Sequence, residues 1–191
     1  MKKITIADNE QILRQRSKEV DFSQKGLLKE IAEFVQACKE ETGVFAMASV
    51  QYGIPKRMVY VKHTDLGGDG KDENNHILMI NPEILSKKGK AYFWEACASG
   101  LDNCAWVARP YQMEVKYCDI KGNVHIDMFT GLASTILSHE LDHLDGILHM
   151  DRAEKLIHAT REERSNLRKV EPYKVISKDC DFSYPPIDKT K

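Results

Sequence analysis

Residues 139–143 constrain this chain more than any other stretch, because they read His139-Glu140-Leu141-Asp142-His143, the pattern H-E-x-x-H. On an α-helix, residues four apart lie on the same face, so the two histidines can bind one metal ion together. Glu140 beside them can act as a base toward a water molecule that the metal activates. The pattern therefore predicts a helix that carries a metal site, and the rest of the chain has to complete that site.

The sequence around the motif indicates that this helix faces a core. It is predicted to open at Thr130 or Gly131 and to run to about residue 144. Leu132, Thr135 and Ile136 recur at helical spacing and share one face with both histidines. The histidines are therefore expected on the core-facing side of the helix, not on a solvated surface.

Composition excludes several function classes. The chain has 191 residues, 42% of them hydrophobic, and a net charge of −1, which gives no signal for nucleic-acid binding. No apolar run approaches the roughly 20 residues of a membrane span, and no apolar segment follows the N-terminal charges as in a secretory signal. Five cysteines, an odd number, favour reduced thiols. We therefore expect a soluble cytoplasmic protein.

Hydrophobic patterning predicts an α+β fold. A first helix is expected at residues 23–41, capped by Ser23, and strands at residues 57–61, 77–82 and 90–95, with Pro82 ending the second of these. Residues 66–75 read as a polar loop, and residues 112–118 and 124–129 form a predicted hairpin. This order predicts antiparallel β-sheets around the central motif helix.

The C-terminal part is predicted to be helical and then irregular. Residues 152–169 are highly charged and read as a C-terminal helix, and the chain after Pro172 shows no regular pattern. We therefore expect a single catalytic domain at residues 1–170 and an irregular tail at residues 171–191.

Three residues are candidates for the third metal ligand. His149 completes H-E-x-x-H-x-x-G-x-x-H, the metzincin protease pattern, but Met150 follows it directly and cannot form the required Met-turn. Glu163 lies twenty residues beyond His143, near the spacing of thermolysin-like proteases, but within an alternating charge run. Cys97 offers a thiolate, a strong ligand for zinc or ferrous iron. The residues alone leave these candidates open.

Three ordered segments resemble the motifs of the peptide deformylase family. That family carries G-x-G-x-A-A-x-Q, E-G-C-x-S and H-E-x-x-H, and this chain has residues 44–51, 95–99 and 139–143 in the same order and spacing. The resemblance covers residues 4–152. Val44 and Ala46 stand where the first motif has glycine, and Ala96 stands where the second has glycine. Because glycine lets a peptide lie close to the backbone, substrate preference is where divergence is expected.

The resemblance implies a function and a set of roles. The function is removal of the formyl group from the N-terminal formyl-methionine of new polypeptides, by a hydrolase that uses one divalent ion. Ferrous iron is implied as the physiological metal, with Zn²⁺, Ni²⁺ or Co²⁺ as substitutes. The implied metal ligands are Cys97, His139 and His143. Glu140 is the implied base, and the Gln51 side chain and the Ala98 backbone N–H are the implied oxyanion donors.

Further roles follow from the same resemblance. Glu95 and Arg109 are expected to form an ion pair that supports the ligand strand. An apolar pocket for methionine is expected from residues in or near the three motifs, namely Phe45, Ala46, Phe93, Leu132, Thr135 and Ile136. Bacterial deformylases are thought to contact the ribosome through their C-terminal helix, and the basic residues Lys155, His158, Arg161, Arg164, Arg168 and Lys169 are candidates here. The alternatives are a metalloprotease that uses His149 or Glu163, and a deformylase-like protein that binds metal or peptides without turnover.

Overall fold

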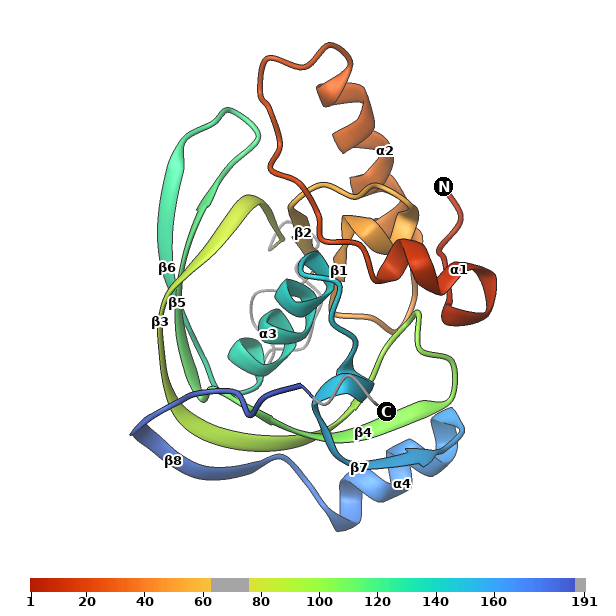
Figure 1. The fold of residues 1–191 in the computed structure, drawn as a ribbon, viewed down its shortest axis with the longest axis vertical. Coiled ribbons are helices and arrows are strands. Elements are labelled where there is room, and N and C mark those ends of the chain that lie inside the picture. The colour runs from red at the N-terminus through yellow and green to blue at the C-terminus, as the bar shows by residue number, and fades with distance from the viewer. Residues whose placement is uncertain (63–75, 188–191) are drawn as a thin grey trace.

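The computed structural model describes residues 1–62 and 76–187, so the predicted loop at residues 66–75 lies outside the described part. The described chain confirms the α+β class. Within the described residues, eight strands form one sheet in which all strand pairings are antiparallel, and four α-helices accompany it. Helix α3, Leu132–Leu144, lies at the centre with the curved sheet wrapped around it (Figure 1). None of the described helices has the length and apolar character that a lipid bilayer requires.

Helix α3 is buried around most of its circumference. Leu137, Leu141 and Leu144 pack into a core with residues of strands β1, Ala46–Ala48, and β5, Gln112–Cys118. Burial of one leucine side chain contributes about 1.5–3 kcal/mol, so these three fix the helix against the sheet. His139 and His143 are buried as well, on the side of the helix that faces the end of strand β3.

Strand β3, Ile77–Ala96, is a single long strand, which corrects the prediction of two short strands. Pro82 does not end it, because the proline coincides with a register shift against β5 between Ile80 and Glu83. Asn81 there has a positive φ of 51°, and Gly89 further along has a φ of 70°. A proline at a bulge removes no ladder hydrogen bond, so these residues bend the strand without ending it.

The long bent strand organises the sheet. β3 pairs with β2, Met58–Val61, with β4, Asn103–Arg109, with β5 and with β8, Lys174–Asp181. The predicted hairpin is confirmed as β5 and β6, Val124–Thr130, in continuous register. Met113, Val115 and Tyr117 alternate inward along β5, as the period-two pattern indicated.

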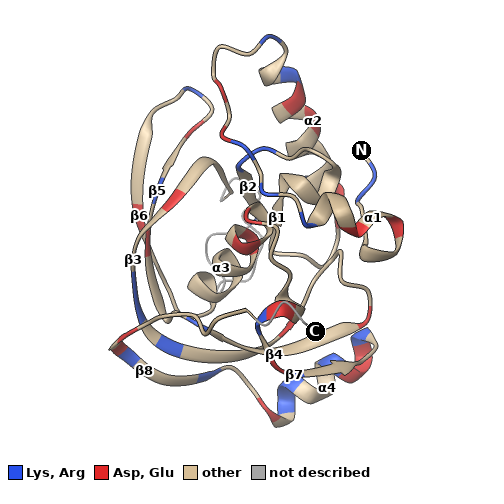
Figure 2. Ribbon diagram, viewed as in Figure 1, with Lys and Arg blue, Asp and Glu red and all other residues tan. Residues whose placement is uncertain are grey.

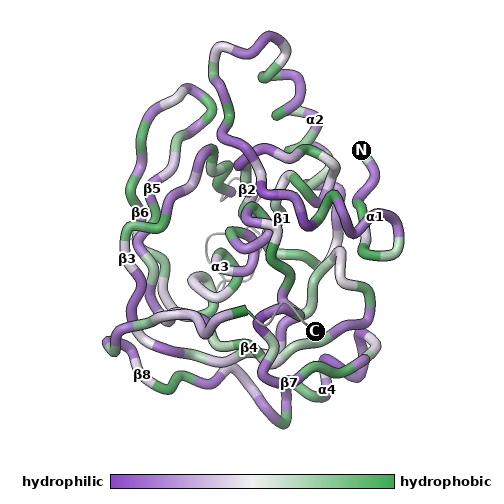
Figure 3. The backbone as a smooth tube through the Cα atoms, in the orientation of Figure 1, coloured by the Kyte–Doolittle hydropathy of each residue, from purple (hydrophilic) through white to green (hydrophobic). Residues whose placement is uncertain are grey.

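The N-terminal helices differ from the prediction in their boundaries. Helix α1, Ile6–Leu13, was not predicted, and α2 spans Leu27–Glu40. Ser23 does not cap α2, because its hydroxyl donates to Asp21 and the helix begins after Gly26, whose φ is 80°. Along α2 the hydropathy alternates between the two extremes, as expected for a helix with one face on the core (Figure 3).

The C-terminal part also differs from the prediction. The expected helix at residues 152–169 divides into the 3₁₀ turn η2, His149–Arg152, strand β7, Ala153–His158, and helix α4, Arg161–Val170. A capping box between Thr160 and Glu163 fixes the start of α4, which carries charges of both signs (Figure 2). The tail is not irregular throughout, because residues Lys174–Asp181 form strand β8 along β3.

Candidate metal centre

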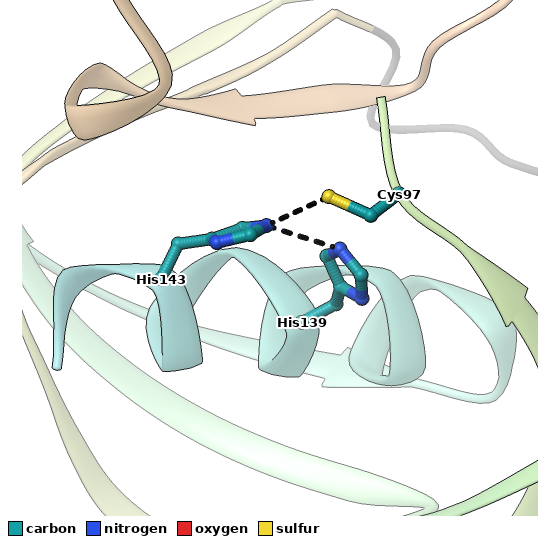
Figure 4. A group of neighbouring side chains, drawn as sticks. All are labelled: Cys97, His139 and His143. Atoms are coloured by element: carbon teal, nitrogen blue, oxygen red, sulfur yellow. Dashed lines mark hydrogen bonds between the residues drawn. The ribbon is translucent and has the colours of Figure 1, made fainter. Parts of the chain in front are cut away.

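Three side chains from two elements meet beside α3. His139 and His143 project from successive turns of the helix toward Cys97, which directly follows β3 (Figure 4). The His143 Nε2 atom lies 3.1 Å from Cys97 Sγ and 3.2 Å from His139 Nε2. All three candidate ligand atoms lie within 4.8 Å of one another. The sequence spacing of two histidines and one distant cysteine thus becomes one compact cluster.

The cluster fits a divalent ion. A tetrahedral metal ion has bonds of about 2.3 Å to sulfur and 2.0–2.1 Å to nitrogen. These bond lengths place two nitrogen ligands about 3.3 Å apart and a sulfur and a nitrogen ligand about 3.6 Å apart. The 3.2 Å and 3.1 Å separations are near those values, so a small adjustment would let one ion contact all three. A Cys/His/His donor set suits zinc or ferrous iron, and three ligands leave a position open.

The other two candidate ligands are not part of this cluster, although the centre of the His149 ring lies 5.6 Å from that of the His139 ring. His149 is buried, but its Nε2–H donates to the Asn103 carbonyl at 3.1 Å, and neither His149 nor Glu163 belongs to the cluster found among the described residues. A Cβ on Gly100 would meet His149 Cε1 at 2.7 Å and Cys97 Cβ at 3.1 Å, so His149 packs beneath the turn that holds Cys97. Glu163 is an exposed capping residue that accepts from the Thr160 backbone at 2.7 Å.

A buried charge network stands behind the histidines. Glu95 accepts from Arg109 at 2.7 and 2.9 Å, and the second of its oxygens also accepts from His139 Nδ1 at 2.9 Å. A proton on Nδ1 leaves Nε2 free to face a metal. Burial raises the pKa of Glu95, but Arg109 and His139 together lower it by more than burial raises it. The Glu95 carboxyl therefore stays ionised. Glu95 and Arg109 therefore form the expected ion pair and also orient one candidate ligand.

The network extends through Asp142, which the motif contains. Asp142 pairs with the fully buried Arg109 and accepts from Arg152 at 2.6 and 2.8 Å. The Arg109 guanidinium also donates to the Tyr184 hydroxyl at 3.3 Å, and the Arg152 guanidinium lies 3.6 Å from the centre of the Tyr184 ring. These contacts tie the motif helix to η2 and to the C-terminal segment.

Gln51 and Ser99 both contact the cysteine. The Gln51 amide donates to Ser99 Oγ at 3.1 Å and to Cys97 Sγ at 3.6 Å, while its oxygen accepts from the Ala48 backbone at 2.9 Å. The Ser99 backbone N–H also donates to Cys97 Sγ at 3.4 Å. Gln51 and Ser99 therefore both contact the sulfur atom of the candidate ligand. Ser99 was not predicted as a site residue, although it is the last residue of the second motif.

Glu140 is placed to exchange protons near neutral pH. Its side chain is buried, and its Oε2 atom has no hydrogen-bond partner among the described residues. Burial raises the pKa of Glu140 to about 7, although nearby His139 opposes this rise. A carboxyl with that pKa can accept and return a proton during one reaction cycle.

The residues predicted for an apolar pocket occupy several environments. Ala46 is in the core, Ile136 packs against the same cluster, and Thr135 is almost fully buried. Phe93 is partly buried with its ring 6.2 Å from that of Tyr173, whereas Phe45 is half exposed. Leu132 is also partly buried, and Ala98 packs against the second core cluster.

Comparison with known proteins identifies the relatives of this chain. The family model for polypeptide deformylase matches residues 1–158. The chain belongs to the polypeptide deformylase family. A peptide deformylase of Finegoldia magna is 32% identical over 161 residues, which cover 84% of this chain and 93% of the relative. One from Mesorhizobium japonicum is 36% identical over 146 residues, covering 76% and 80%.

Solved deformylase structures share the fold. A Synechococcus elongatus deformylase in complex with actinonin superposes with a TM-score of 0.70 at 28% identity, covering 90% of this chain and 87% of that one. A class I type b deformylase of Acinetobacter baumannii bound to Met-Ala-Ser gives 0.68 at 27% identity, covering 80% and 97%. Family membership makes this chain a hydrolase of protein biosynthesis that acts on formylated nascent peptides and depends on a metal.

Proposed function

We propose that this chain removes the formyl group from N-terminal formyl-methionine with one divalent ion held by Cys97, His139 and His143. The observation that supports this most is the cluster of three ligand atoms within 4.8 Å, with the buried Glu140 carboxyl in the same motif. A bound ion supplies a Lewis acid that polarises the formyl group and lowers the pKa of water. The protein residues bind the peptide, orient it and move the proton.

Glu140 has the role of proton carrier in this proposal. Its pKa of about 7 lets it take a proton from the attacking water and deliver it to the leaving amine. Formate and a free amino terminus are the products. The buried position of Glu140 supports the role, because exclusion of bulk water keeps the proton between the reacting groups.

Gln51 and Ala98 have the role of oxyanion donors. The Gln51 amide nitrogen lies 3.6 Å from Cys97 Sγ, so it is adjacent to the place where an ion contacting Cys97 would be held. Ala98 follows Cys97 directly, and its backbone N–H is independent of the side chain at this position. Each such donor typically contributes about a hundred- to a thousandfold in rate when it faces the developing charge.

We propose ferrous iron as the physiological metal, with zinc, nickel or cobalt as substitutes, and the cytoplasm as the compartment. One thiolate and two imidazoles form a donor set that all of these ions accept. Free cysteines throughout, including the buried Cys97, support a reducing compartment.

A ribosome contact through α4 is a separate proposal about the partner. Four of the six basic side chains donate hydrogen bonds within the chain. Arg164 donates to the Ala159 carbonyl and Arg168 to the Trp94 carbonyl, while Lys155 donates to Glu171 and Lys169 to Asn166. His158 at the end of β7 and Arg161 and Lys169 on α4 are exposed, so phosphate groups can reach them. Co-sedimentation with ribosomes should weaken when Arg161 and Lys169 are both changed to glutamate, and equal binding by this variant would remove the proposal.

Formate release tests the function. The chain is prepared anaerobically with ferrous iron, and formate from formyl-Met-Ala-Ser is measured with a coupled dehydrogenase. Glu140→Gln should keep its metal and lose about a hundred- to ten-thousandfold in rate, because the proton carrier is gone. Glu163→Gln is the matched control and should keep the rate, since Glu163 only caps α4. Metal-loaded wild type that binds the peptide without releasing formate would favour a binding protein instead.

A further inference from the structure

The C-terminal segment reaches the site although it lies beyond the residues matched by the family model. That match ends at residue 158, while Tyr173 and Tyr184 both contact residues around α3 or its supporting network. Strand β8 pairs with β3, with Lys174 opposite Tyr92, and this register sets Tyr173 beside Phe93. In Figure 1 the segment after β8 turns back toward the centre of the molecule.

Tyr173 has two neighbours, Phe93 and Thr135, that lie on the faces of β3 and α3 carrying the metal cluster. Phe93 is two residues before Glu95 on the same strand, so both side chains lie on the face that meets His139. Thr135 is four residues before His139, which places it one turn away on the same face of α3. Tyr173 therefore lies against residues of both elements that carry the metal ligands.

The contacts of Tyr173 are those of a packing residue. Its ring meets the Phe93 ring edge to face, with centres 6.2 Å apart and planes at 64°. Burial raises the pKa of Tyr173, and nearby Thr135 opposes this rise. Even so, the Tyr173 hydroxyl is buried without a hydrogen bond to any described residue, and Thr135 donates instead to the Gly131 carbonyl. A hydroxyl left unpaired is unfavourable, so it is the ring that accounts for this placement.

We propose that Tyr173 forms the end wall of the pocket for the substrate's first side chain and is a specificity-determining residue. The inference rests on the proposed function and on the expectation that Phe93 and Thr135 line the methionine pocket. A wall made of a rigid ring limits how far a side chain can extend between β3 and α3. The unbranched methionine side chain fits in front of it, and a phenylalanine side chain is excluded by the Tyr173 ring.

Selectivity between two substrates tests the proposal. The ratio of kcat/KM for formyl-Phe-Ala-Ser to that for formyl-Met-Ala-Ser is measured for wild type, Tyr173→Ala and Tyr173→Phe. Removing the ring should raise the ratio at least tenfold, and Tyr173→Phe should retain the wild-type ratio because it keeps the ring. The ratio of the binding affinities of the products Phe-Ala-Ser and Met-Ala-Ser is measured as well, with zinc-loaded protein.

Matched variants separate selectivity from folding. Tyr92→Ala removes the same side chain from the opposite face of β3, where it stacks on Trp106 at 5.4 Å, and should leave the ratio unchanged. Tyr173→Leu shortens the wall while keeping apolar burial, and it replaces Tyr173→Ala if that variant fails to fold. An unchanged ratio in a folded Tyr173 variant, in both turnover and binding, overturns the proposal. If the Tyr173 variants shift the ratio of product affinities while wild type shows no turnover, the proposal is supported and the proposed function is refuted.

Discussion

Replacement of Arg109 tests the idea that a buried charge network supports the metal ligands. Arg109 is fully buried and contacts Glu95 through two hydrogen bonds of 2.7 and 2.9 Å, as well as Asp142. Arg109→Met keeps much of the apolar volume but leaves two buried carboxylates without this partner. Breaking a buried pair in this way costs about 3–5 kcal/mol. For a chain of this size, that corresponds to a decrease in Tm of about 6–20 °C.

The metal affinity should fall together with the stability. Glu95 holds the His139 ring through Nδ1, and an unpaired Glu95 with a raised pKa would hold it less firmly. Loss of such a supporting contact typically lowers metal affinity about 10–100-fold. Urea unfolding of the metal-free protein measures the first effect, and competition with a chelating dye measures the second.

Two further variants make this prediction specific. Arg16→Met removes an exposed arginine that lies 3.7 Å from Asp145, and it should change the unfolding free energy by about 0.5 kcal/mol or less. The double variant Glu95→Gln with Arg109→Met should recover part of the lost stability, because one unpaired charge is removed. The reasoning is refuted if the free energy of unfolding of Arg109→Met lies within about 1 kcal/mol of the wild-type value and the variant binds metal with the same affinity.

Two other predictions address the third ligand and a crowded turn. Cys97→Ala should lose bound metal as measured by elemental analysis, whereas His149→Ala should retain it when folded; the reverse result would make His149 the ligand. Gly146→Ala should destabilise the chain by more than the roughly 1–2 kcal/mol of a left-handed residue, because its φ is 73° and a Cβ would lie 2.2 Å from the Arg14 carbonyl oxygen. Gly26→Ala, with a φ of 80° and open space around the Cβ, isolates the backbone effect in urea unfolding, and equal costs would contradict the crowding argument.

Local patterns predicted the hairpin and the motif helix well. Every second residue of 112–118 is buried, as the alternating pattern predicted. Such a pattern needs only a neighbouring strand and a core to form a strand. The motif helix spans Leu132–Leu144, close to its predicted bounds. In both cases the burial pattern is dense enough that the local sequence specifies the element.

The predictions failed where tertiary pairing overrides local signals. Pro82 reads as a strand end, but it lies within β3, where a bulge against β5 accommodates it. Residues 153–158 read as the start of a charged helix, yet they pair with β4 as strand β7. A short charged segment lacks a decisive period, so the free strand edge of β4 determines its conformation.

The sequence by itself determined the chemistry that this chain can perform. Two histidines and a glutamate at helical spacing, with the resemblance of residues 95–99 to a second motif, specified the donor types and the reaction class, because such patterns depend on local geometry. Only the tertiary structure decided which atoms meet. Cys97 and His143 are 46 residues apart in sequence and 3.1 Å apart in space, and Tyr173 enters from a segment with no motif. Contacts of that kind arise from sheet register and core packing, which no local pattern encodes.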